Sequence, residues 1–144
     1  MKKLYGLSMI LLIFFFVACG NNKVEETISK NNSQNIIADY LDAVSEGDME
    51  KIKEYSTDEN SKIFNEDTLN ILKDDVESLN LLKCEIRSSN ENRALVDSEV
   101  EVICSDDFIA TGDWKPGKTI STKTFELIKV NNEWKVNGWG VYTD

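Results

Sequence analysis

The sequence predicts an α+β domain in which N-terminal helices pack on one face of a curved antiparallel sheet of about four strands. Two observations carry this prediction. Apolar residues recur at helical spacing in the first half of the chain and alternate with polar residues in the second half. Helices followed by a run of antiparallel strands are typical of domains whose helices cover one face of a sheet.

The first helical pattern begins at about Ser33. Its apolar residues share one helix face: Ile36, Ile37, Tyr40, Leu41 and Val44. Asn32 or Ser33 can cap its start, and Gly47 suits its end, because glycine readily adopts the left-handed conformation that ends many helices. Asp48 can then cap a second short helix. The inward residues of that helix are Met49, Ile52 and Tyr55.

A third helical pattern covers residues 66–79. Its apolar residues step by three and four: Leu69, Leu72, Val76 and Leu79. Strand patterns follow it. The first strand has alternate apolar residues: Leu82, Cys84 and Ile86. After a polar turn at residues 88–92, a longer strand has its own alternating set: Val96, Ser98, Val100, Val102 and Cys104.

A loop rich in turn residues covers positions 105–118 and contains the only proline. It leads to two more strands, at residues 119–130 and 133–142. Asn131 and Asn132 lie between them and are a signal for a tight two-residue hairpin turn. We therefore expect the last strands to form an antiparallel meander.

The N-terminus has the parts of a secretory signal peptide. Lys2 and Lys3 precede an apolar stretch at residues 4–17, and Ala18, Cys19 and Gly20 follow at the point where the chain becomes polar. The apolar stretch has about 15 residues, fewer than the roughly 20 that a membrane-spanning helix needs.

This arrangement resembles the bacterial lipoprotein signal, in which a small-residue box ends at a cysteine. The resemblance implies that residues 1–18 are removed and that Cys19 is acylated, which holds the protein on the extracytoplasmic face of the cell membrane. Phe16 departs from the leucine that usually stands at this place in the family. The alternative is an uncleaved membrane anchor with an incidental Cys19. Residues 19–32 are expected to be a flexible tether and residues 33–144 the folded domain.

The charge of the chain limits its partners. The net charge is −10, and removal of Lys2 and Lys3 with the signal leaves 14 basic against 26 acidic side chains, a net −12. Such a surface repels nucleic acid and anionic lipid headgroups. The lipid must therefore hold the protein without electrostatic help. The sequence has no histidine, so the commonest general base and transition-metal ligand is absent.

Two segments resemble nuclear transport factor 2-like, or cystatin-like, α+β domains. Residues 36–55 contain the Gly47-Asp48 break between a first and a second helix. Residues 125–142 resemble the closing hairpin, with a Trp-Lys-Val step at positions 134–136. The resemblance implies a cone-shaped half-barrel with a pocket between sheet and helices. Members of this superfamily include ketosteroid isomerase and polyketide cyclases as well as binding and assembly modules, so the fold does not decide the function.

No residue is assigned a catalytic role. Asp39 and Asp42 flank inward-facing residues of the first helix and are expected to face solvent. Asp97 and Glu99 occupy the strand phase opposite the apolar residues, which is typically the solvated face of a sheet.

The aromatic residues of the C-terminal half give the best candidates for ligand binding: Trp114, Trp139 and Tyr142. Trp139 stands between Gly138 and Gly140, where bare backbone permits close approach or a bulge. Core packing is the competing interpretation of these aromatic residues.

Cys84 and Cys104 remain after the anchor cysteine. The expected hairpin register puts Cys84 opposite about Val96, so the two cysteines are not cross-strand partners, and we expect two buried thiols. Two scattered cysteines without histidine predict no metal site, and no cofactor is indicated.

The leading hypothesis is a membrane-tethered, non-enzymatic module that binds a small apolar ligand or an envelope protein. Two alternatives stay open. The first is an isomerase-like or cyclase-like enzyme that uses a pocket carboxylate. The second is an assembly module that forms a homodimer or docks through its sheet face.

Overall fold

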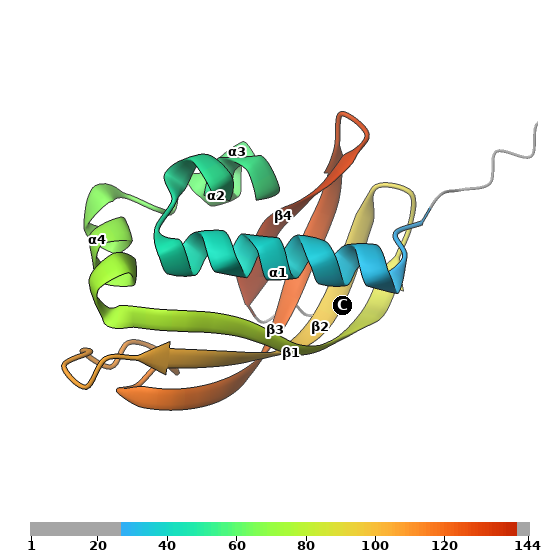
Figure 1. Ribbon diagram of the computed structural model, residues 1–144. Helices are drawn as coiled ribbons and strands as arrows, with labels where there is room; N and C mark the ends of the chain where they lie inside the picture. Colours follow the sequence, from blue (N-terminus) through green and yellow to red (C-terminus); the bar gives the residue numbers. More distant parts are fainter. Residues whose placement is uncertain (1–26, 141–144) are drawn as a thin grey trace, which may run out of the picture.

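Four helices cover one face of a four-stranded antiparallel sheet in the computed structural model, which describes residues 27–140. The predicted α+β class and the curved sheet of four strands are therefore confirmed. The sheet is a simple meander with the strand order β1-β2-β3-β4. Figure 1 shows α1 lying across the sheet, with α2 and α3 beside β4 and with α4 at one end. The elements are α1 (Lys30–Glu46), α2 (Met49–Tyr55), α3 (Asp58–Ser61), α4 (Glu66–Asp75), β1 (Val76–Ser89), β2 (Arg93–Cys104), β3 (Gly117–Val130) and β4 (Glu133–Gly140).

Helix α1 begins earlier than the sequence pattern indicated. Its N-cap is Ser29, whose hydroxyl accepts from the backbone N–H of Asn32 at 3.3 Å. Ile28 is buried in the hydrophobic core. The segment from Ile28 to Asn32, which was expected to be tether, therefore belongs to the folded domain. Cys19, the residue that the sequence predicts to be lipidated, lies outside the described residues.

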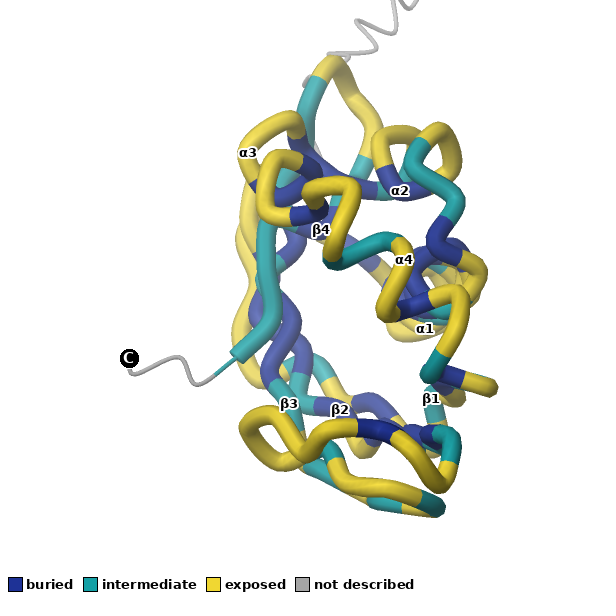
Figure 2. The backbone as a smooth tube through the Cα atoms, turned by 90° about the vertical axis from the view of Figure 1, so that its left-hand side faces the viewer, coloured by how far each residue is buried: buried dark blue, intermediate teal, exposed yellow. Residues whose placement is uncertain are grey.

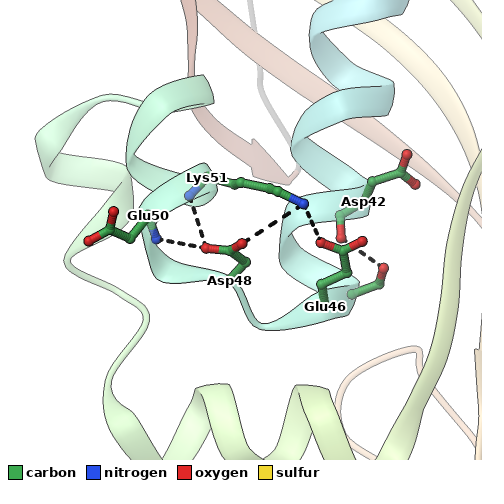
Figure 3. Close-up of polar contacts among 6 residues, drawn as sticks. Asp42, Glu46, Asp48, Glu50 and Lys51 are labelled. Carbon is green, nitrogen blue, oxygen red and sulfur yellow. Dashed lines mark hydrogen bonds and ion pairs between the residues drawn. The ribbon is translucent and has the colours of Figure 1, made fainter.

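The apolar face of α1 packs as predicted, with Ile37, Tyr40, Leu41 and Val44 buried and Ile36 half-buried. Gly47 ends the helix with a φ of 59°. Asp48 caps α2, accepting at Oδ1 from the N–H groups of Glu50 (3.1 Å) and Lys51 (3.2 Å), while Lys51 Nζ lies 2.7 Å from Glu46 Oε2 (Figure 3). These contacts join α1 to α2 through a sharp turn.

The third predicted helix was too long. Helix α4 ends at Asp75, and Val76 and Leu79 are the first buried residues of β1. The β1–β2 register shifts between Val76 and Ser78, which is a β-bulge. A bulge places residues three apart on the same face of a strand, so it imitates helical spacing in the sequence.

A second bulge in β1 corrects another expectation. The register shifts between Leu81 and Lys83, and Leu82, expected to point inward, is 49% exposed. Cys84 is buried as predicted but pairs with Ser98 rather than Val96, and Cys104 pairs with Val76. Both cysteines are free thiols.

The remaining strands follow their patterns closely. The alternate residues of β2 are buried as predicted: Val96, Ser98, Val100, Val102 and Cys104. Asn131 and Asn132 connect β3 to β4 with φ angles of 50° and 71°. Two consecutive positive φ angles are the geometry of the predicted tight hairpin. Figure 2 shows buried stretches along α1, β2 and β3, and exposed residues at the turns.

The face of the sheet that the helices leave open is polar. Arg87 contacts both carboxylate oxygens of Asp97, at 3.0 and 2.7 Å, and also Thr124 at 3.1 Å. Lys118 forms an ion pair with Glu101 on the same face. Among the described residues, Leu82 and Ile120 are the large apolar side chains exposed along the strands. This face therefore has little of the apolar surface that an obligate interface buries.

Gly47 provides a test of the α1–α2 turn. A Cβ at this position would meet Lys73 Cγ at 2.7 Å and the Leu69 carbonyl at 3.0 Å, in addition to the cost of the positive φ. We expect Gly47→Ala to lower the free energy of unfolding by about 2 kcal/mol or more. Gly112→Ala is the matched control, because Gly112 has a φ of +63° but nothing within 4 Å of its Cβ position. Urea denaturation followed by circular dichroism measures both; equal losses would contradict the steric argument.

Candidate functional site

A pocket of about 640 Å³ lies where α4, the segment 105–116, the middle of β3 and the end of β4 meet. Most of its lining is apolar or aromatic. The lining residues are Thr68, Ile71, Leu72, Asp75, Phe108, Ile109, Thr111, Asp113, Trp114, Lys123, Trp139 and Gly140. The sequence regions that form it are far apart, so the pocket exists only in the folded chain.

Helix α4 supplies one wall. Its contributions are Thr68, Ile71, Leu72 and Asp75, which share one face because residues three and four apart are neighbours on a helix. Leu72 is buried, whereas Ile71 is 51% exposed. The helix therefore presents apolar surface both inside the pocket and at its mouth.

The segment 105–116 forms the facing wall. Ser105 fastens it to the end of α4, because its N–H donates to the Asp75 carbonyl at 2.8 Å and its hydroxyl lies 3.2 Å from Asp75 Oδ1. Thr111 and Trp114 exchange two backbone hydrogen bonds of 3.2 Å across a tight turn. Phe108 is buried against the core, while Ile109 is 83% exposed.

Two tryptophans expected to bind a ligand meet in this pocket. The rings of Trp114 and Trp139 lie 6.1 Å apart at an interplanar angle of 73°. The ring centroid of Trp139 also lies 5.2 Å from that of Phe125 and 6.4 Å from that of Tyr40. Trp139 is therefore part of the core and also part of the pocket wall, so core packing and a place in a ligand site are compatible interpretations of this residue. Tyr142 lies outside the described residues.

An ion pair closes one side of the pocket. Lys123 projects from β3 and its Nζ lies 2.7 Å from Asp113 Oδ2. The Lys123 ammonium beside Asp113 holds the pKa of that carboxyl below its ordinary value. Asp113 is therefore ionised at neutral pH and ill suited to be a general acid.

The four carboxylates considered as catalytic candidates do not line this pocket. Asp39 and Asp42 are exposed on α1, as expected. Asp97 accepts from Arg87 and Thr124 on the open face of the sheet, and hydrogen bonding from Arg87 lowers its pKa. Glu99 is exposed on the same strand.

Asp75 and Asp113 are the pocket carboxylates that the sequence did not single out. Asp75 falls inside the predicted helix of residues 66–79 and Asp113 in the predicted loop of residues 105–118, and neither belongs to a motif. Within residues 27–140, no group of three or more His, Cys, Asp or Glu side chains is arranged to hold a metal ion.

The fold has relatives among solved structures. No family model and no curated protein matches the sequence. The chain is similar to the intermembrane space region of the chloroplast protein ARC6, at 17% identity and a TM-score of 0.57, over 81% of this chain and 98% of that one. It is also similar to a SEC-C motif containing protein from Rhodopseudomonas palustris, at 13% identity and a TM-score of 0.48, over 70% and 71% of the two chains. At these identities the likeness to ARC6 concerns the fold alone.

The Asp113–Lys123 pair predicts a measurable titration. Because the folded pKa of Asp113 is depressed, the stabilisation from this pair is complete above the ordinary aspartate pKa and is lost as the pH falls through the folded value. We expect Lys123→Met to raise the Asp113 pKa toward its ordinary value, as measured by NMR titration of the side-chain carboxyl. The depressed pKa of Asp97, which depends on Arg87, serves as the control. An unchanged Asp113 pKa in the variant would contradict this account.

Proposed function

We propose that this protein is a lipid-anchored, extracytoplasmic module that binds a small apolar ligand in the pocket between α4 and the segment 105–116. The observation that carries the proposal is the apolar and aromatic lining of a pocket of about 640 Å³. Pockets of roughly 300–1,000 Å³ with such lining are typical of small-molecule sites. The proposal retains the nuclear transport factor 2-like assignment, in which a pocket lies between sheet and helices.

The pocket lies near the C-terminal end of α1, whereas the segment that carries Cys19 precedes the N-terminal end of this helix in the chain. The start of α1 is the end nearer to Cys19 in the chain, and α4 lies beside its other end (Figure 1). A helix of 17 residues is about 25 Å long. A lipid on Cys19 would therefore leave the pocket at the end of the domain far from the point where the tether enters. Among the described residues, no helix is both long and apolar enough to cross a membrane.

A binding role fits the pocket better than the enzymatic alternative. An isomerase-like or cyclase-like reaction needs a carboxylate whose pKa is adjusted toward the working pH. The Asp113 pKa is shifted in the opposite direction by Lys123. Asp75 is the other lining carboxylate, and its side chain is engaged with the Ser105 hydroxyl at 3.2 Å.

A protein partner is the other form that the binding role can take. Ile71 and Ile109 are exposed large apolar residues, and both lie in the pocket lining. A projecting side chain of an envelope protein could occupy the pocket in the same way as a small molecule. The open face of the sheet is less suited to a homodimer, because its side chains are largely charged and paired with one another.

Trp114 allows a direct test of the pocket. We expect phenylnaphthylamine, an uncharged apolar fluorescent probe, to bind saturably and Trp114→Ala to weaken its binding about tenfold, or about 1.4 kcal/mol. Trp134→Ala is the matched control, because Trp134 lies outside the pocket lining, with Lys129 Nζ 5.8 Å from its ring centroid. Trp114 is preferred to Trp139 because Trp139 also packs in the core. Absence of saturable binding, or equal affinity in Trp114→Ala and the unsubstituted protein, would overturn the proposed pocket function.

Cys19 allows a separate test of the anchor. We expect Cys19→Ser to shift the protein from the membrane fraction to the soluble fraction, because the acidic surface offers no electrostatic attachment to anionic lipid. Immunoblotting of cell fractions with and without a high-salt wash measures the distribution. A Cys19→Ser protein that remains fully with membranes would favour the uncleaved-anchor alternative.

A further inference from the structure

The charges that line the pocket do not balance. The lining contains two carboxylates, Asp75 and Asp113, and one ammonium, Lys123. Lys123 and Asp113 offset each other at 2.7 Å. Asp75 has no ion-pair partner among residues 27–140, and its carboxylate accepts from the neutral Ser105 hydroxyl. The pocket therefore carries an excess of negative charge at the end of α4.

The end of α4 adds to this negative potential. Asp75 is the last residue of the helix, where the helix macrodipole corresponds to a partial negative charge of up to about half a unit. The Asp75 carbonyl accepts from Ser105 N–H and the Leu72 carbonyl accepts from Val76 N–H, so only part of this potential remains uncompensated. Lys73 is the basic residue of the last turn, but it does not line the pocket. Its side chain lies beside Gly47, where an added Cβ would meet Lys73 Cγ at 2.7 Å. No lysine therefore compensates Asp75 within the pocket.

The aromatic walls also favour a cation. Trp114 and Trp139 both line the pocket, with ring planes inclined at 73° to each other. The face of a tryptophan ring attracts a cation by about 0.5–2 kcal/mol, depending on how far the cation is desolvated. The surrounding side chains, such as Ile71 and Phe108, offer apolar surface to the rest of such a ligand.

We infer that the pocket takes an amphiphilic cation: a ligand with an apolar body and an amine or quaternary ammonium group that lies near Asp75 and the tryptophan rings. This inference rests on the proposed pocket function and adds the charge of the ligand. An anionic amphiphile fits less well, because the one lining ammonium is already bound by Asp113 and the chain as a whole carries a charge of −10. The acidic surface draws cations toward the mouth instead.

Three probes with ten-carbon chains test this inference: decyltrimethylammonium and decanoate, each below its critical micelle concentration, and decanol below its solubility limit. The protein used is the mature chain, residues 19–144, carrying Cys19→Ser so that it is purified without lipid. Isothermal titration calorimetry measures each affinity. We expect decyltrimethylammonium to bind about tenfold more tightly than decanol, and decanoate to bind more weakly than decanol. Higher salt should reduce the difference in affinity between decyltrimethylammonium and decanol.

Asp75→Asn and Asp74→Asn form a matched pair of variants. The asparagine at position 75 keeps an oxygen that can accept from Ser105 but removes the charge. We expect Asp75→Asn to weaken decyltrimethylammonium binding three- to tenfold and to leave decanol binding unchanged. Asp74 is exposed on the same helix and outside the lining, so Asp74→Asn should change neither affinity by more than about twofold.

A second variant tests the same charge balance from the other side of the pocket. Asp113→Asn leaves Lys123 without its carboxylate partner. We expect this variant to bind decanoate more tightly and decyltrimethylammonium less tightly than the parent chain. Unchanged affinities for both probes would overturn the assignment of a cationic ligand.

The outcomes separate the two proposals. If decanol and decyltrimethylammonium bind with equal affinity, or if Asp75→Asn and Asp74→Asn behave alike, the cationic ligand is wrong while the apolar pocket function stands. If none of the three probes binds, the pocket function fails and the inference fails with it.

Discussion

Tyr40 is a side chain of α1 that contacts α3, two strands of the sheet and one wall of the pocket. It is completely buried, and its ring meets Phe125 of β3 at 6.5 Å and Trp139 of β4 at 6.4 Å, both edge-on. Its hydroxyl accepts from Asn60 Nδ2 at 2.9 Å, so α3 is joined to the same point. Each such aromatic pair contributes about 0.5–1.5 kcal/mol beyond the burial of its area. The position of Trp139, and with it one wall of the pocket, depends on this contact.

The parts of the fold that were predicted correctly are those set by local chemistry. Gly47 and Asp48 determine the break between α1 and α2 through a left-handed cap and a side-chain cap. Asn131 and Asn132 determine the last hairpin. The errors cluster in β1, whose register against β2 shifts at more than one place. A bulge changes which residues share a face without leaving a signature in the hydrophobic pattern. The three-residue spacing of Val76 and Leu79 was therefore interpreted as helical, and Leu82 was wrongly expected to point inward.

The candidate site was predictable only in part, for a related reason. Trp114 and Trp139 were candidates because they are large aromatic residues of the C-terminal half, and Trp139 also because it stands between two glycines. The wall formed by α4 was not foreseen, because nothing in the sequence shows that Asp75 meets Ser105 across a separation of 30 residues. The charge of the pocket follows from that contact and from the Asp113–Lys123 pair. Both are products of tertiary structure rather than of a motif.

The two sides of the pocket are held by different kinds of interaction. Trp139 is fixed by packing against Phe125 and Tyr40, so the sheet side cannot move without disturbing the core. The segment 105–116 is anchored by Phe108 in the core and by the contact of Trp114 with Trp139. At its rim it is held by polar contacts, from Ser105 to Asp75 and from Asp113 to Lys123. Partly exposed polar contacts of this kind contribute about 1 kcal/mol or less each. A ligand that binds only the folded chain raises its free energy of unfolding by about 2.7 kcal/mol when the ligand concentration is one hundred times the Kd. Adjustment to a ligand is therefore expected on the side of this segment, while the tryptophan on the sheet side keeps its position.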